Sequence, residues 1–131
     1  MDSIFTKIIK GEIPCHKIYE DDRTFAFMDI HPIQPGHVLV VSKTQVEEFY
    51  LLDEQDATAL WNTVHKVAEK LRTVFPQKRR IALMVEGLDV AHVHVKVFPV
   101  DTAVEYRSLP DESVEPDHDA LAAMAAQLSF D

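Results

Sequence analysis

The stretch His92-Val93-His94-Val95-Lys96-Val97-Phe98-Pro99 decides the fold of this chain. Polar side chains alternate with valines along it, and successive side chains of a β-strand leave on opposite faces. The three valines therefore mark a buried face, while the opposite face carries two imidazole rings and one ammonium group. Proline has no N–H to donate to a neighbouring strand, so we expect the strand to end at Pro99.

The two histidines and the lysine of this strand are the first candidate functional residues. A half-exposed strand with a basic outer face is the plain structural alternative, and a single histidine would favour it. His92, His94 and Lys96 together, opposite an all-valine face, favour a site. Near neutral pH an imidazole can attack phosphorus or accept a proton, and an imidazolium can donate one. His37, which follows a Pro-Gly turn and opens an apolar run, is a further candidate.

Two histidines on one strand face could also bind a metal ion, with a third ligand from another strand. Lys96 argues against this, because an ammonium group on the same face repels a divalent cation and attracts an anion. We therefore expect no metal ligands and no cofactor, and a phosphate group as the bound species. The single cysteine, Cys15, permits neither an internal disulfide nor a cysteine-based zinc site.

The rest of the chain predicts strands joined by short turns, with helices between them. Apolar residues recur at helical spacing at Leu60, Val64, Val67 and Leu71, which predicts a long helix. The other expected elements are a short helix over 3–10, strands over 17–20, 24–28, 37–42 and 81–85, a tight hairpin over 86–89, and a final helix over 119–128. Together they predict an α+β fold with an antiparallel sheet of about five strands.

Length and charge limit the possible functions. The 131 residues suit one domain with a real core, and the net charge of −9 makes general nucleic-acid binding an unexpected function. No apolar run reaches membrane-spanning length and no signal peptide is expected, so we expect a cytoplasmic protein without a membrane partner. Residues 101–131 hold eight acidic residues and one arginine, and we expect an acidic C-terminal extension with a short helix there.

The chain resembles the histidine triad (HIT) family, close to its branch of purine nucleoside phosphoramidases and nucleotide-binding proteins. The resemblance covers about residues 2–100, which we interpret as a HIT-like nucleotide-binding domain (1–100). It rests on Ile4-Phe5, on Lys7 to Pro14, on Tyr19 to Asp22, on Phe27 to Ile30 with Pro32, on Gly36 to Val40, and on His92-x-His94.

The resemblance implies a homodimer that cleaves the bond between a nucleotide's α-phosphate and its leaving group. His94 matches the nucleophile of the family, which forms a nucleotidyl-histidine intermediate that water later opens. His92 matches the first histidine of the triad, which orders the site, and His37 matches a further histidine facing it. Asp29 matches the carboxylate that binds the ribose hydroxyls. Two isoleucines match apolar walls of the purine pocket, and a phenylalanine lies near it: Ile8, Ile30 and Phe5.

This chain departs from the family pattern at three positions around the triad. The third histidine is Lys96, an expected asparagine is Val85, and the loop before the triad is shortened to Leu88-Asp89. Those family groups touch the phosphate or the leaving group, so their loss bears on substrate identity and rate. Some members also bind zinc through an N-terminal Cys-x-x-Cys, which is replaced here by Ser3 and Thr6.

The sequence thus predicts a nucleotide hydrolase or transferase acting on purine nucleoside monophosphate derivatives, of the phosphoramidate or adenylate type. Retention of His94 and His37 favours this enzyme. Loss of the loop donors favours the alternative, a nucleotide-binding or partner-binding protein with little or no turnover. A third alternative is a zinc hydrolase that uses His37, His92 and His94.

Overall fold

The computed structural model describes all residues, 1–131. The elements in chain order are α1 (Ile4–Ile9), β1 (Lys17–Glu20), β2 (Thr24–Met28), β3 (Val38–Ser42), the 3₁₀ turn η1 (Phe49–Leu51), α2 (Glu54–Val74), β4 (Arg80–Met84), β5 (His94–Val100), α3 (Ala103–Arg107) and α4 (His118–Leu128).

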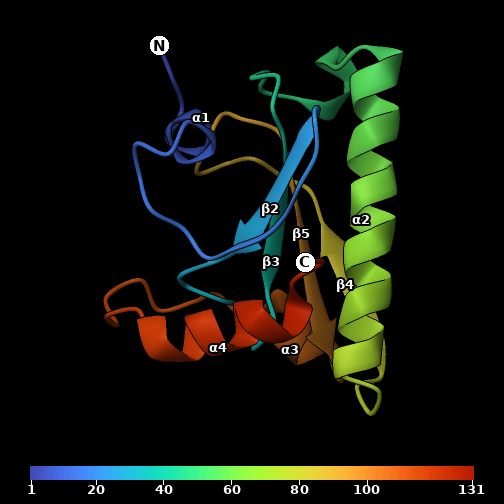
Figure 1. Cartoon of the computed structure of the whole chain (residues 1–131). Helices are drawn as coiled ribbons and strands as arrows, with labels where there is room; N and C mark the ends of the chain where they lie inside the picture. The colour runs from blue at the N-terminus through green and yellow to red at the C-terminus, as the bar shows by residue number, and fades with distance from the viewer.

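The five strands form one antiparallel sheet in the order β1-β2-β3-β5-β4. The sheet passes from β3 directly to β5, because α2 leads the chain to β4 at the outer edge before β5 returns between them (Figure 1). This arrangement confirms the predicted α+β fold with an antiparallel sheet.

Apolar side chains fill both faces of the sheet, which explains why every residue of β2 and β3 is buried. One face packs against α2 and α4 through the larger core, which includes Val95 and Val97 of β5. The other face packs against α1 through Phe5 and Ile8. The polar face of β5 is therefore turned toward the side of the sheet on which α1 lies.

The long helix forms as the spacing of its apolar residues predicts. Leu60, Val64, Val67 and Leu71 are buried on one side of α2. Asp53 caps its N-terminus by accepting a hydrogen bond from the backbone N–H of Asp56. No helix of the structure is long and apolar enough to cross a membrane.

The segment between β4 and β5 differs from the prediction. Residues 85–93 form a loop without strand pairing, where the sequence predicts a tight hairpin, and β5 begins at His94 instead of His92. The strand also continues through Pro99 to Val100. Its pairing with β3 stops at Val97, so Pro99 lies where β5 has only one neighbouring strand and a missing N–H is tolerated.

The acidic C-terminal segment, residues 101–131, forms two helices where the sequence predicts one. It contains α3 as well as the predicted final helix, α4. Leu121, Ala125 and Leu128 of α4 belong to the same core as β3 and α2. The division into a domain and an extension at residue 100 stays a prediction about how the chain is organised.

Candidate functional site

Strand β5 places His94 and Lys96 on the same face of the sheet, as its alternation predicts. His94 pairs with Val41 and Lys96 with Leu39 on the neighbouring β3. The α1 helix lies above this face, and the ring of Phe5 meets that of His94 edge-on, with 4.8 Å between the ring centres. Only 4% of His94 is exposed.

The hydrogen bonds of His94 decide which of its ring nitrogens can react. Its Nδ1 lies 2.7 Å from the backbone carbonyl of His92, and a carbonyl can only accept, so Nδ1 carries the hydrogen. Nε2 therefore carries the lone pair, and no protein group bonds to it. Burial lowers the pKa of His94, and the charge of Lys96 adds to this lowering, so the ring is neutral near pH 7. A neutral imidazole with a free Nε2 is a competent nucleophile.

His92 is fully buried in the loop that leads into β5, and both of its ring nitrogens have partners. Nε2 donates to the carbonyl of Ser42 over 2.6 Å. Nδ1 lies 2.6 Å from the hydroxyl oxygen of Ser3, at the start of α1. With both nitrogens occupied, His92 holds the site together and has no free atom for a metal ion or a substrate.

Lys96 forms an ion pair that the sequence did not indicate. Its Nζ lies 3.4 Å from Oε1 of Glu86, in the shortened loop. Burial alone would raise the pKa of Glu86, but the Lys96 ammonium and the N–H groups of Leu88 and Gly87 lower it. The carboxylate therefore stays charged beside Lys96. An anion that binds Lys96 must share the ammonium with Glu86 or displace it.

Asp29 and His37 come together where β2 ends and β3 begins. The backbone N–H of Asp29 donates to the carbonyl of His37, and Oδ1 of Asp29 accepts from the backbone N–H of His31. Burial raises the pKa of Asp29, and the backbone N–H of His31 and the charge of Lys96 oppose that rise. Its side chain keeps 21% exposure, so it remains within reach of a ligand.

His37 is held as a neutral ring beside Asp29. Its Nδ1 accepts from the backbone N–H of Ile33, so Nε2 carries the hydrogen. Nε2 is buried without a hydrogen-bond partner, 3.6 Å from Oδ2 of Asp29. Burial lowers the pKa of His37 to about 3, with the charges of Lys96 and His94 adding to the effect, so the contact with Asp29 is not an ion pair at neutral pH. Phe98 packs against the ring.

The apolar residues expected around a purine lie on two different elements. Phe5 and Ile8 are buried on α1, in the core on the histidine side of the sheet. Ile30 lies in the loop after β2 and is 43% exposed. The structure brings Phe5 next to His92 and His94, and it leaves Ile30 open to solvent.

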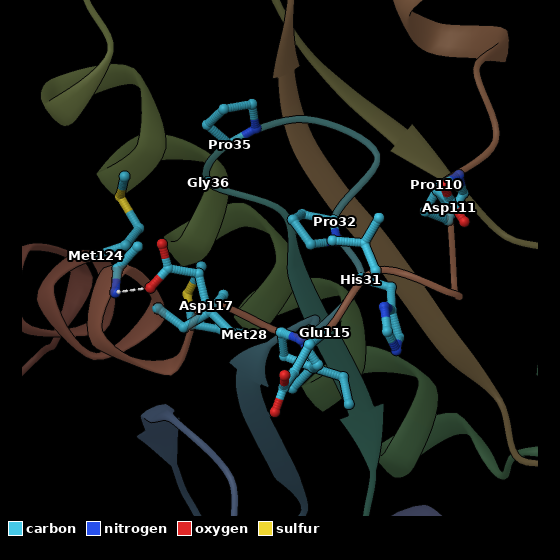
Figure 2. A pocket seen from close by; sticks show the side chains of 15 residues that line it. Met28, His31, Pro32, Pro35, Gly36, Pro110, Asp111, Glu115, Asp117 and Met124 are labelled. Atoms are coloured by element: carbon cyan, nitrogen blue, oxygen red, sulfur yellow. Dashed lines mark hydrogen bonds between the residues drawn. The ribbon is translucent and has the colours of Figure 1, made fainter.

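Two cavities bear on the position of the site. A cavity of about 170 Å³ is lined by His94, Val93 and the shortened loop at Val85, Glu86 and Gly87. A larger cavity of about 440 Å³ lies between the 30–36 loop, the 110–117 arm and α4 (Figure 2). The larger one contains Ile30 but none of His37, His92, His94 and Lys96. The smaller one is lined by His94, but by neither Lys96 nor Asp29.

The candidate zinc alternative finds no geometric support among these histidines. The structure contains no group of three or more histidine, cysteine, aspartate or glutamate residues arranged to hold a metal ion. At the N-terminal positions, Ser3, Thr6 and Gln45 bond to one another, and Ser3 bonds to His92. Ser42, Gln45 and Glu86 could not be predicted as site residues from the sequence, because none lies in a repeating pattern.

Comparison with known proteins identifies the family of this chain. Residues 10–103 match the model of the HIT domain. The chain is 36% identical over 100 residues to the protein Hit of Bacillus subtilis, covering 73% of this chain and 69% of that protein. It is 34% identical over 103 residues to the adenosine 5′-monophosphoramidase hnt1 of Schizosaccharomyces pombe, covering 76% of this chain and 74% of that enzyme.

A solved structure matches almost the whole chain. The crystal structure of a Hit-like protein from Bartonella henselae superimposes with a TM-score of 0.83 at 28% sequence identity, covering 97% of this chain and 93% of that one. The chain belongs to the HIT family.

Proposed function

We propose that the protein is a nucleotide hydrolase or transferase that cleaves the α-phosphate bond of purine nucleoside monophosphate derivatives. One observation carries the proposal: Nδ1–H of His94 is fixed on the carbonyl of His92, Nε2 has no protein partner, and His94 lines a cavity. This arrangement selects the tautomer needed for attack before a substrate binds. A relative named as an adenosine 5′-monophosphoramidase supports the substrate class.

In the proposed reaction, Nε2 of His94 attacks the α-phosphorus. An N–P bond forms while the bond from phosphorus to the leaving group breaks, and the leaving group departs with that electron pair and takes up a proton. The ring then carries positive charge, which the His92 carbonyl stabilises through Nδ1–H. Water next attacks phosphorus and releases a proton to the solvent, which balances the proton that the leaving group took from it; the N–P electron pair returns to Nε2, and the nucleoside monophosphate is released.

The remaining residues divide between phosphate and nucleoside. Lys96 follows His94 on the same strand, and its ammonium group neutralises phosphate oxygens. Asp29 binds the ribose hydroxyls, since a carboxylate can accept two hydrogen bonds at once. Phe5, Ile8 and Ile30 contact the purine. His37, as a buried neutral ring, supports Asp29 and does not supply a proton to the leaving group.

We also propose that the protein is a homodimer in the cytoplasm. Strand β4 is the outer strand of the sheet, with one side unpaired. Leu83 is 40% exposed on this edge and Val85, which follows it, is 42% exposed. A second copy pairing there would extend the sheet and cover both side chains. Light scattering at micromolar concentration tests this, and a monomeric mass would contradict it.

A protein that binds nucleotides without turning them over is the second candidate. The ion pair between Lys96 and Glu86 favours it, because the cation closest to the phosphate position is already engaged. The deciding experiment incubates the purified chain with adenosine 5′-phosphoramidate and with an aminoacyl-adenylate and measures released AMP. We expect repeated turnover on at least one. AMP binding without release from either substrate would leave the binding protein as the function.

A further inference from the structure

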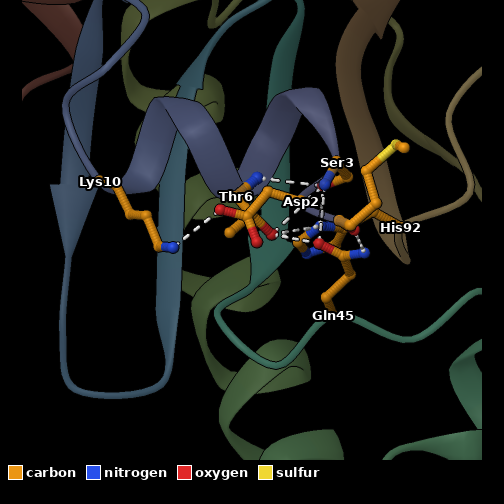
Figure 3. Close-up of polar contacts among 7 residues, drawn as sticks. Asp2, Ser3, Thr6, Lys10, Gln45 and His92 are labelled. Atoms are coloured by element: carbon orange, nitrogen blue, oxygen red, sulfur yellow. Dashed lines mark hydrogen bonds and ion pairs between the residues drawn. The ribbon is translucent and has the colours of Figure 1, made fainter.

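Ser3 connects the N-terminal helix to the histidine pair. Its hydroxyl oxygen lies 2.6 Å from Nδ1 of His92, although the two residues are 89 positions apart in the sequence. The carbonyl of His92 in turn receives the Nδ1–H of His94. Figure 3 shows Ser3, Thr6 and Gln45 gathered around His92. A short chain of contacts thus runs from the start of α1 to the nucleophile.

The direction of each hydrogen bond in this chain is fixed by chemistry. The carbonyl of Ser42 can only accept, so His92 carries its hydrogen on Nε2 and presents a lone pair on Nδ1. Ser3 must therefore donate its single hydroxyl hydrogen to His92. The same oxygen accepts from the backbone N–H of Thr6, as the N-cap of α1.

Thr6 and Gln45 form further hydrogen bonds around Ser3. The Thr6 hydroxyl donates to Oε1 of Gln45 over 2.6 Å, and the backbone N–H of Ser3 donates to the same oxygen over 2.8 Å. The amide group of Gln45 donates to the carbonyl of Met1. The Ser3 hydroxyl also lies 3.3 Å from the Thr6 hydroxyl oxygen, but its contact with Nδ1 of His92 is shorter, at 2.6 Å, so His92 is the better acceptor for its hydrogen.

We propose that Ser3 is a positioning residue for His94: its hydroxyl holds the His92 ring, and with it the His92 carbonyl that orients the nucleophile. The inference deepens the proposed function, on which its kinetic consequence rests. Ser3 touches neither substrate nor reacting atoms. Its effect on the reaction passes through His92, which has no other group bonded to Nδ1 at a comparable distance; the Thr6 hydroxyl is 3.5 Å away.

The test separates this role from helix capping by three substitutions. Ser3→Ala removes both the cap and the donor. Ser3→Thr keeps both. Ser3→Gly keeps most of the cap, because glycine is a good N-cap residue, and it offers no group to His92. Thr6→Val is the matched control, because it removes a hydroxyl from the same cluster and leaves the bond from Ser3 to His92.

We expect Ser3→Ala and Ser3→Gly each to lower kcat by roughly tenfold, the scale of one lost hydrogen bond to a buried group, with KM within about twofold. Ser3→Thr and Thr6→Val should stay within about twofold of the wild type. Nitrogen-15 NMR of labelled histidine should show the Nε2–H tautomer of His92 in the wild type and in Ser3→Thr. It should also show faster solvent exchange of the His94 Nδ1–H in Ser3→Ala.

The NMR measurement stands apart from catalysis, so it tests the inference even if the chain turns over no nucleotide. An unchanged His94 exchange rate in Ser3→Ala would overturn the positioning role. So would a wild-type kcat in Ser3→Gly, which keeps most of the helix cap and loses the donor. A Ser3→Ala protein that fails to fold is answered by Ser3→Gly and Ser3→Thr, whose thermal unfolding should match the wild type within a few degrees.

Discussion

The histidines at the two ends of the site, His94 and His37, differ in what their unbonded ring nitrogen can do. At one end, His94 lines a cavity and has a bonded Nδ1 and a free Nε2. At the other end, His37 has a bonded Nδ1 and an unpartnered Nε2–H that is buried beside Asp29. The free nitrogen of His94 is an electron-pair donor, whereas that of His37 is a hydrogen donor. The same residue type is thus prepared for attack in one place and for supporting a carboxylate in the other.

The largest effect that this comparison predicts is at the nucleophile. We expect His94→Ala to lower kcat for AMP release by at least about a thousandfold, because the nitrogen that attacks phosphorus is gone. AMP affinity should stay within a few-fold, since the valines of β5 make the packing contacts. Activity assays and calorimetric AMP titration check this. A variant that loses both binding and fold would show His94 to be structural.

At the opposite end, the ribose tests the role of Asp29. The wild type should prefer AMP derivatives to their 2′-deoxy counterparts by about tenfold or more, the scale of a hydrogen bond to a charged group. Asp29→Asn, which is nearly the same shape, should lose most of that preference while retaining activity on the deoxy substrate. The measurement is kcat/KM for both substrates. Equal values in the wild type would remove Asp29 from the ribose site.

Lys96 lies on β5 between the His94 end and the His37 end of the site. Substituting it tests whether both ends belong to one phosphate site. We expect Lys96→Met, which keeps the length of the side chain and loses its charge, to lower kcat/KM by roughly tenfold. Lys96→His should regain activity mainly on substrates with amine leaving groups, because an imidazolium can donate a proton. Glu86→Gln frees the ammonium from its ion pair and should not reduce the rate. Unchanged kcat/KM in Lys96→Met on amine-leaving and acyl-leaving adenylates would limit Lys96 to its contact with Glu86.

The smallest effect concerns stability at the His37 end. The ordinary histidine pKa of 6.5 applies to the unfolded chain, and burial lowers the pKa of His37 to about 3 in the folded state. The unfolded state therefore binds the extra proton between these values. The contribution of His37 to stability is present above pH 6.5 and is lost as the pH falls toward 3. When the pH falls from 7 to 4.5, the wild type should lose more unfolding free energy than His37→Gln does. The difference between the two losses should be on the order of 1–3 kcal/mol.

Denaturant unfolding of wild type and His37→Gln at both pH values measures this difference. Comparing the two proteins cancels the other buried titrating groups, among them His92 and Asp29. Identical pH dependence in both would mean that His37 takes up its proton in the folded state. The contrast between the two ends of the site would then fail on the His37 side.

The features that the sequence predicts well are those carried by local patterns. The stripe from Leu60 to Leu71 lies on one face of α2, and the alternation along β5 places His94 and Lys96 on one side. Each follows from a repeat of 3.6 or 2 residues, which needs no knowledge of the rest of the fold. The short turns between the predicted strands also predict the antiparallel sheet, which the structure confirms.

The features that the sequence did not predict depend on contacts between distant segments. Ser3 contacts His92 only because α1 packs on the face of the sheet that carries His94. Glu86 contacts Lys96 only because residues 85–93 form an open loop. Pro99 fits inside β5 because β3 starts at Val38, opposite Val97, and does not extend beside Pro99. No short-range pattern encodes these facts.

The central claim is that Nε2 of His94 attacks phosphorus and forms a covalent intermediate. The stereochemical course at the α-phosphorus tests it most directly, using a phosphorothioate analogue of the substrate that is chiral at phosphorus and hydrolysed in oxygen-18 water. Each in-line displacement inverts the configuration, so attack by His94 followed by attack by water predicts overall retention. Inversion would mean that water attacks the substrate directly, and would contradict the claim.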